Sequence, residues 1–88
     1  MSRALASPSH AVLRGLLVKA RKDAQLTQQQ VAAKLGVPQS YVSKYEKGER
    51  KLDVIEFLAL CDVLGVSAAG AIEALRQAIT TKSAPPWP

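Results

Sequence analysis

The chain contains one cysteine and one histidine, Cys61 and His10, among its 88 residues. A single cysteine cannot close an internal disulfide, and these two residues cannot supply the four Cys or His ligands of a structural zinc site. The composition therefore excludes disulfide-bridged and Cys/His zinc-stabilised miniproteins. We expect the protein to need no metal and no cofactor.

Aromatic residues and long apolar runs are also scarce. One Phe, one Trp and two Tyr accompany an apolar content of 48%, so we expect a core of Leu, Val, Ile and Ala. No apolar run approaches the ~20 residues of a membrane span, and residues 1–9 lack the apolar stretch of a signal peptide. The length allows one domain, which we expect to be reduced, cytoplasmic and not bound to a membrane.

Positive charge exceeds negative charge and is unevenly distributed. The net charge of the whole chain is +5. Up to Leu52 there are ten basic and three acidic residues, a net charge of +7, whereas from Asp53 onward two basic and four acidic residues give −2. This asymmetry indicates that the first part meets a polyanion such as nucleic acid. Chance clustering on a solvated helical surface is the alternative.

The apolar residues recur at helical spacing, and no alternating strand pattern occurs. We expect a first helix over residues 10–24. A second helix is expected to begin with a capping box of Thr27 and Gln30 and to end at Gly36, and a third to span residues 38–47. The side chains expected to face inward are Leu13, Leu16, Leu17 and Ala20 in the first helix, Val31, Ala32 and Leu35 in the second, and Val42 and Tyr45 in the third.

The same signals predict two further helices. Asp53 with Glu56 forms another capping box before a helix over residues 53–64, and Ser67 caps a helix that runs to about Ile79. The side chains expected on the buried face of the fourth helix are Val54, Phe57, Leu58, Cys61 and Leu64. The expected division of the chain is a flexible arm over residues 1–9, one all-α domain over residues 10–79, and a flexible Pro-rich tail over residues 80–88.

The second and third expected helices, joined by a short turn at Gly36, have the arrangement of a helix-turn-helix. In such a motif the first helix crosses the phosphate backbone and the second places side chains against base edges in the major groove. Gln, Ser and Lys can all hydrogen-bond base edges. The residues expected to read bases are Gln39, Ser40, Ser43 and Lys44. An ordinary polar solvated face is the alternative.

Three stretches of the sequence resemble a known family. Residues 26–37 (LTQQQVAAKLGV) and 42–50 (VSKYEKGER) are similar to the two halves of the Cro/repressor (XRE-type) helix-turn-helix, and residues 53–66 resemble that family's fourth helix. The resemblance extends over about residues 12–75. It implies an all-α, five-helix, lambda-repressor-like domain whose partner is double-stranded DNA.

The resemblance also implies roles for individual residues. Gln28 would bind a phosphate and brace Gln39. Arg21 and Glu46 would form a partly buried ion pair that holds the third helix on the first. The residues of the loop after the third helix that would bind phosphates are Lys47, Arg50 and Lys51.

Two positions depart from the family pattern. Pro38 stands where Ser or Thr often caps the third helix, and Tyr41 is larger than the usual residue. Tyr41 has two functional interpretations, a phosphate contact through its hydroxyl and an apolar contact with a thymine methyl group. Covering the turn is its structural alternative.

The residue types that often carry catalysis have structural interpretations here. Cys61 lies on the apolar face of the fourth expected helix and is interpreted as a core residue, because a reactive thiol needs exposure and a lowered pKa. His10 precedes or caps the first helix. A single His and scattered carboxylates assemble no catalytic set, so we do not expect an enzyme.

These inferences predict a sequence-specific duplex-DNA-binding transcriptional regulator of prokaryotic, phage or mobile-element origin, associated with the nucleoid. One reading helix specifies few base pairs, so we expect a repressor that acts as a homodimer on a palindromic operator. The residues expected at the dimer interface are Ile72, Leu75, Ile79 and Trp87. Closure of the monomer's own core is the alternative for these side chains.

Two other functional hypotheses remain. In the first, the chain is an antitoxin-type interaction module that binds a partner protein and autoregulates its operon. In the second, it binds polyanions, including RNA, without sequence preference. Co-purification with a second small protein distinguishes the first, and comparison of specific with scrambled duplexes distinguishes the second.

Overall fold

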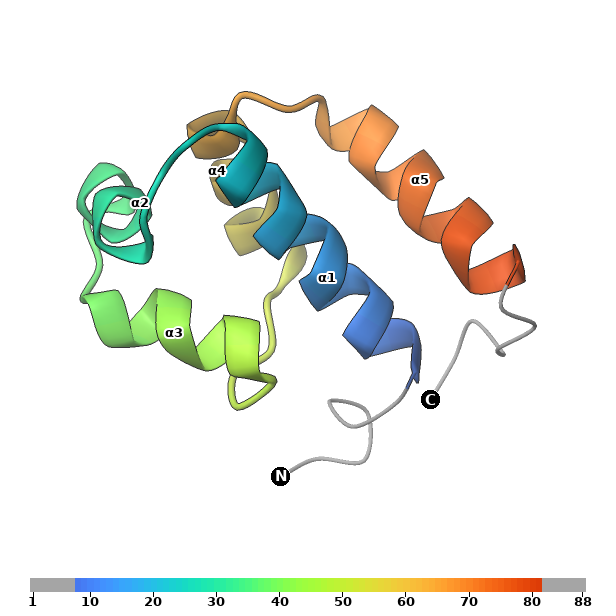
Figure 1. Cartoon of the computed structure of the whole chain (residues 1–88), viewed down its shortest axis with the longest axis horizontal. Coiled ribbons are helices and arrows are strands. Elements are labelled where there is room, and N and C mark those ends of the chain that lie inside the picture. The colour runs from blue at the N-terminus through green and yellow to red at the C-terminus, as the bar shows by residue number, and fades with distance from the viewer. Residues whose placement is uncertain (1–7, 82–88) are drawn as a thin grey trace.

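The computed structural model describes residues 8–81, and its five elements are all α-helices (Figure 1). This confirms the predicted all-α, five-helix fold. The helices are α1 (Pro8–Asp23), α2 (Gln28–Leu35), α3 (Gln39–Lys47), α4 (Val54–Leu64) and α5 (Ala68–Thr81).

Both outer helices extend further than predicted. α1 begins at Pro8 rather than His10, so Pro8 and the buried Ser9 belong to the helix and not to the arm. Proline suits this first turn because its missing N–H would have no helical partner there. α5 continues to Thr81 rather than ending at Ile79. The rest of the predicted arm and tail, including Trp87, lies outside the described residues.

The two predicted capping boxes are present. The Thr27 hydroxyl accepts a hydrogen bond from the Gln30 N–H at 3.1 Å, and the Gln30 side chain accepts one from the Thr27 N–H at 2.8 Å. Asp53 and Glu56 make the same reciprocal pair at 2.7 Å and 2.9 Å. Each box satisfies two backbone donors that have no partner within the helix.

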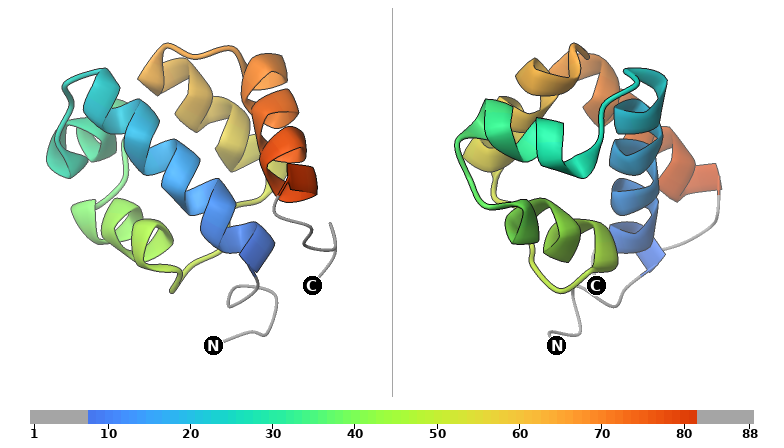
Figure 2. Two further views of the ribbon diagram at one scale, coloured as in Figure 1. Left: turned by 45° about the vertical axis from the view of Figure 1, so that its right-hand side comes forward. Right: turned by 60° about the vertical axis from the view of Figure 1, so that its left-hand side comes forward.

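The helices pack around one small apolar core. α1 contacts α3 on one side and α5 on the other, while α2 packs against α3 and α4 (Figures 1 and 2). The buried side chains that form the core cluster are Leu17, Val31, Ala32, Val42, Tyr45, Leu60 and Leu64. Every helix except α5 contributes to this cluster, and Leu13 and Ala20 of α1 pack against it.

The predicted buried face of α4 was wrong in part. Val54 and Leu58 are 71% and 42% exposed, whereas Leu60, which the prediction omitted, is 1% exposed. The actual inner face follows residues 57, 60, 61 and 64, a regular helical spacing. Because α4 is apolar around most of its circumference, its sequence does not single out one face.

All five helices are short, and the longest, α1, has 16 residues. Within residues 8–81 no single helix is long and apolar enough to cross a membrane. α4 and α5 meet that test only in combination, with a bend of 110° between them.

Candidate nucleic-acid interface

A tight turn over residues 36–38 joins α2 to α3. Gly36 has a φ of +75°, a left-handed conformation that glycine adopts without steric cost. Its N–H donates to the Ala33 carbonyl at 3.3 Å, and the Val37 N–H donates to the Ala32 carbonyl at 3.0 Å. These bonds end α2 and fix the direction in which α3 leaves it. α3 consequently lies on the opposite side of α1 from α5 (Figure 2).

α3 has a buried face and a solvent face. Val42 and Tyr45 are 0% and 1% exposed, respectively. The predicted base-reading residues Gln39, Ser40 and Lys44 are exposed, whereas Ser43 is half-buried. A helix with its side chains is about 10–12 Å across, and the major groove is about 12 Å wide. The solvent face of α3 therefore has the size and the hydrogen-bonding groups that base recognition needs.

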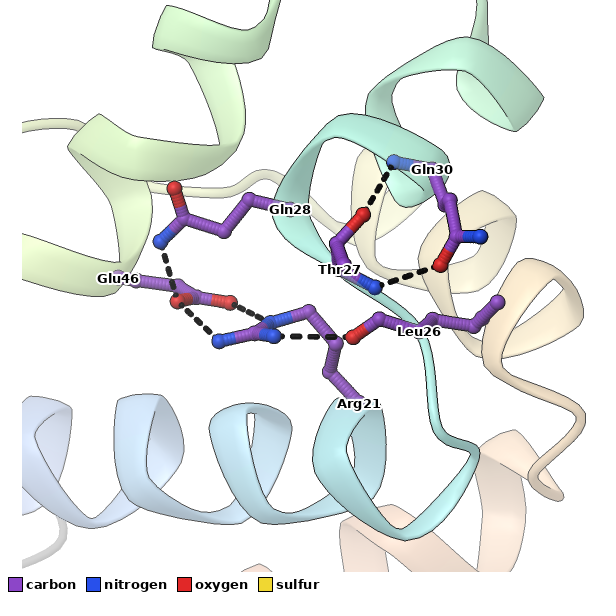
Figure 3. A network of polar contacts seen from close by, with 6 residues as sticks. All are labelled: Arg21, Leu26, Thr27, Gln28, Gln30 and Glu46. Atoms are coloured by element: carbon purple, nitrogen blue, oxygen red, sulfur yellow. Dashed lines mark hydrogen bonds and ion pairs between the residues drawn. The ribbon is translucent and has the colours of Figure 1, made fainter.

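Arg21 and Glu46 form an ion pair between the end of α1 and α3 (Figure 3). Arg21 Nε donates to Glu46 Oε2 at 2.8 Å, and Nη2 donates to Oε1 at 3.2 Å. Arg21 Nη1 donates to the Leu26 carbonyl at 2.9 Å. The hydrogen bonds to Glu46 raise the pKa of Arg21, against the opposing effect of burial. The side chains are only 12% and 7% exposed, so this pair fixes α3 on α1 away from bulk water.

Gln28 joins the same network. Its amide nitrogen donates to Glu46 Oε1 at 2.8 Å, so the Glu46 carboxylate connects α1, α2 and α3 (Figure 3). The sequence predicted that Gln28 binds a phosphate and braces Gln39. The structure gives its side chain a different partner, Glu46, and leaves the second amide hydrogen for another acceptor.

The cations of the loop after α3 have different surroundings. Lys47, which the structure places at the end of α3 rather than in the loop, and Lys51 are both exposed. Arg50 instead donates to Glu56 on α4, and its Cζ lies 4.4 Å from the centroid of the Tyr41 ring. A guanidinium in this position combines an ion pair with a cation–π contact. Of the three cations predicted to bind phosphates, the two lysines therefore face solvent, and Arg50 is held by Glu56 and Tyr41.

Tyr41 lies between Arg50 and the core. Its ring meets that of Tyr45 edge-on, with centroids 6.2 Å apart and an angle of 79° between the planes. Burial and the nearby Glu56 carboxylate raise the pKa of Tyr41, while Arg50 lowers it. Tyr41 is half-buried and packs against the core.

Two contributions to the site were not anticipated from the sequence. Glu56 was predicted only as a capping residue, and its bond to Arg50 joins residues six apart that share no helix or turn pattern. Arg14 of α1 packs over Gly48, so closely that a side chain at position 48 would place its Cβ 2.9 Å from Arg14 Cζ. No local sequence signal identifies either contact, because both depend on how the helices pack.

The residues interpreted as structural differ in how close they lie to this surface. Cys61 is buried in the core, and burial raises the pKa of its thiol. His10 is half-buried at the start of α1, where it lines a small cavity together with Arg50 and Lys51. Within residues 8–81, no group of three or more His, Cys, Asp or Glu side chains is arranged to hold a metal ion.

The sequence of this region matches a known family. Residues 17–70 match the model of the family HTH_3, described as helix-turn-helix. Over 47 residues the chain is 43% identical to y4dJ of Sinorhizobium fredii, an uncharacterized HTH-type transcriptional regulator. The aligned part covers 53% of this chain and 61% of that protein, so the chain spans less than two thirds of this relative.

Solved structures share the fold. An XRE-family-like protein from Pseudomonas syringae pv. tomato is 43% identical, with a TM-score of 0.76 over 78% of this chain and 84% of that one. The restriction-modification controller protein C.Esp1396I is 24% identical, with a TM-score of 0.76 over 84% of this chain and 97% of that one. That controller has been solved as a tetramer in complex with its natural 35 base-pair operator.

Proposed function

Since the chain belongs to the XRE-type helix-turn-helix family of DNA-binding transcriptional regulators, we propose that it represses transcription by binding a palindromic operator as a homodimer. The observation that carries this proposal is the solvent face of α3. Gln39, Ser40 and Lys44 are exposed there on a helix that the Arg21–Glu46 pair holds in place.

In the proposed complex α3 enters the major groove and its exposed residues read base edges. Gln39 suits bidentate bonding to adenine, and Lys44 suits donation to guanine O6 and N7. Lys47, the exposed last residue of α3, and Lys51, exposed in the loop that follows, bind the phosphate backbone. The second amide hydrogen of Gln28 is available to a phosphate at the start of α2.

Selection of binding sites from random duplex DNA tests the proposal. We expect a palindrome whose half-sites are about 34 Å apart, one turn of DNA. Lys44→Ala should change the preference at one position of each half-site by about 1–3 kcal/mol. Lys47→Ala is the matched control and should weaken all duplexes about equally. An enriched pool without a shared sequence, or the same affinity for selected and scrambled duplexes, would contradict sequence-specific binding.

The homodimer needs an apolar surface outside the DNA-binding face. Of the residues predicted for it, Ile72 is 51% exposed, whereas Leu75 and Ile79 are half-buried. The structure adds Val54 and Ile55, 71% and 73% exposed, in the first turn of α4, and Leu58 one turn later. Scattered apolar side chains are normal on a protein surface, but a contiguous group is typical of an interface. We therefore place the dimer interface on α4, with Ile72 of α5 as a further contact.

Ile55→Glu tests this interface. We expect the molar mass from light scattering to fall from that of a dimer to that of a monomer, because the substitution buries an unpaired carboxylate between subunits. Ala33→Glu, at an exposed position of α2, introduces the same charge elsewhere and should leave the mass unchanged. A wild-type chain that is monomeric even on its selected operator would contradict the homodimer. Stable co-purification with a second small protein would instead support the antitoxin hypothesis.

A further inference from the structure

Arg50 is held by groups from two different helices. Its Nη2 donates to Glu56 Oε2 in α4, and its guanidinium lies over the ring of Tyr41 in α3, 4.4 Å from the centroid. The Arg50 side chain therefore lies between Tyr41 of α3 and Glu56 of α4 and contacts both. With 40% of its side chain exposed, Arg50 remains accessible to solvent. Glu56 uses one of its donors, so most of the five guanidinium N–H groups can meet another acceptor.

Glu56 performs two roles with one carboxylate. Its Oε1 accepts the Asp53 N–H at 2.9 Å, completing the capping box that begins α4, while its Oε2 accepts from Arg50. The backbone N–H of Asp53, together with Tyr41 and Arg50, lowers the pKa of Glu56. The carboxylate therefore stays ionised at neutral pH, and the start of α4 is a fixed anchor for the loop.

We propose that Glu56 is a positioning residue for DNA binding, which holds Arg50 against Tyr41 so that the guanidinium is ready to meet a backbone phosphate beside α3. This inference rests on the proposed function. A free arginine loses rotamer freedom when it contacts a phosphate, whereas one already ordered by Glu56 and Tyr41 loses less. Arg50 is thus ordered before DNA arrives.

The carboxylate also carries a negative charge, which opposes the approach of a phosphate. That effect is reduced because Arg50 and the N-terminus of α4 both compensate the charge. The two effects predict opposite outcomes when the charge is removed. Loss of positioning weakens DNA binding, whereas loss of repulsion strengthens it.

Glu56→Gln separates these effects. Glutamine also completes a capping box, so α4 should begin normally and the melting temperature should change little. We expect the affinity for the selected operator, measured by fluorescence anisotropy, to fall about 2- to 10-fold, the range for ordering one long side chain. Glu49→Gln is the matched control, because it removes an exposed negative charge from the same loop. It should leave the affinity unchanged or raise it.

A double-mutant cycle completes the test. If Glu56 acts through Arg50, then Arg50→Ala combined with Glu56→Gln should bind no more weakly than Arg50→Ala alone. Two results would overturn the inference while leaving the proposed function intact. One is a Glu56→Gln variant that binds the operator as tightly as the wild type or more tightly. The other is a double variant whose loss of affinity equals the sum of the two single losses. A wild-type protein that fails to distinguish its selected duplex from a scrambled one would overturn both.

Discussion

The Arg21–Glu46 pair is the polar contact on which the position of α3 depends most directly. Both side chains are nearly buried, and Gln28 and the Leu26 carbonyl satisfy further hydrogen-bonding groups of the pair. Removing one partner of such a pair leaves an uncompensated charge in a poorly hydrated place. The stability of the domain and the orientation of α3 are therefore linked at this site.

Arg21→Ala should lower the free energy of unfolding by about 3 kcal/mol. For a domain of this size that corresponds to a fall in melting temperature of roughly 12–24 °C, measured by circular dichroism. Lys19→Ala is the matched control, since its pair with Asp23 is also a basic–acidic contact of α1 but is 73% and 65% exposed. An exposed pair contributes at most about 1 kcal/mol. Equal effects of the two variants would contradict the assigned role of Arg21.

Tyr45 contributes a different residue-level feature. Its side chain fills the core at 1% exposure, and its hydroxyl is buried without a hydrogen-bond partner among the described residues. Burial is the main cause that raises the pKa of Tyr45 above its ordinary value near 10. The folded protein thus keeps this proton at a pH where the unfolded chain releases it, and stability should decline as the pH rises above about 10.

Tyr45→Phe should raise the free energy of unfolding at pH 7 by about 1 kcal/mol, because a buried unpaired hydroxyl is removed. It should also remove the Tyr45 contribution to the loss of stability above about pH 10. Urea unfolding at several pH values measures both effects. Tyr41→Phe, which removes a hydroxyl beside Glu56 and Arg50, should not stabilise the protein. A destabilised Tyr45→Phe variant would show that the Tyr45 hydroxyl has a stabilising partner.

Among the helices, α3 depends most on its neighbours. It has nine residues, and Pro38 provides no side-chain cap at its start. Isolated helices shorter than about 12–15 residues are marginal in water, so α3 forms because Val42 and Tyr45 pack into the core and Glu46 is paired. α2 has eight residues but begins with a complete capping box.

Thr27→Ala should destabilise the domain by about 1 kcal/mol, since it removes the hydroxyl that accepts the Gln30 N–H. Thr27→Ser keeps a hydroxyl and is the control. We expect the melting temperature of the alanine variant to fall by about 4–8 °C, with the serine variant close to the wild type. The same loss in both variants would mean that the methyl group, not the cap, stabilises this position.

The sequence predicted local features of the elements well and non-local ones poorly. Capping boxes and the Gly36 turn follow from residues within three positions of each other, so Thr27, Asp53 and Gly36 identified them. The inner face of α4 was misassigned at Val54 and Leu58, because an almost uniformly apolar helix has no periodic signal. Of the site, the exposed face of α3 followed from periodicity, and the Arg21–Glu46 pair followed only from the family resemblance.

For the molecule as a whole, the position of charge matters more than its sum. The basic residues of the first part of the chain include exposed lysines around the end of α3, at positions 44, 47 and 51. On α5, the basic residue Arg76 is paired with Glu73, and α5 lies across α1 from α3 (Figure 1). We therefore expect phosphate contacts from the α3 side of the domain and not from α5.

Lys47→Ala should flatten the dependence of log affinity on log salt concentration by about 0.9 for each half-site, the effect of one lost phosphate contact. Lys51→Ala should have a similar effect. Arg76→Ala removes a cation from the opposite side and should leave the slope unchanged. Anisotropy titrations between 50 and 300 mM salt provide the measurement, and an equal flattening by Arg76→Ala would indicate diffuse attraction rather than contacts at the α3 side.

The division of α3 into two faces also bears on how such regulators diverge. Val42, Tyr45 and Glu46 maintain the scaffold from one side, while Gln39, Ser40 and Lys44 stand in solvent on the other. Substitutions on the solvent face can accumulate because they do not prevent the domain from folding. After a gene duplication, a few substitutions on this face can thus change the operator that one copy binds. The two regulators then bind different operators in the same cell while keeping the same fold.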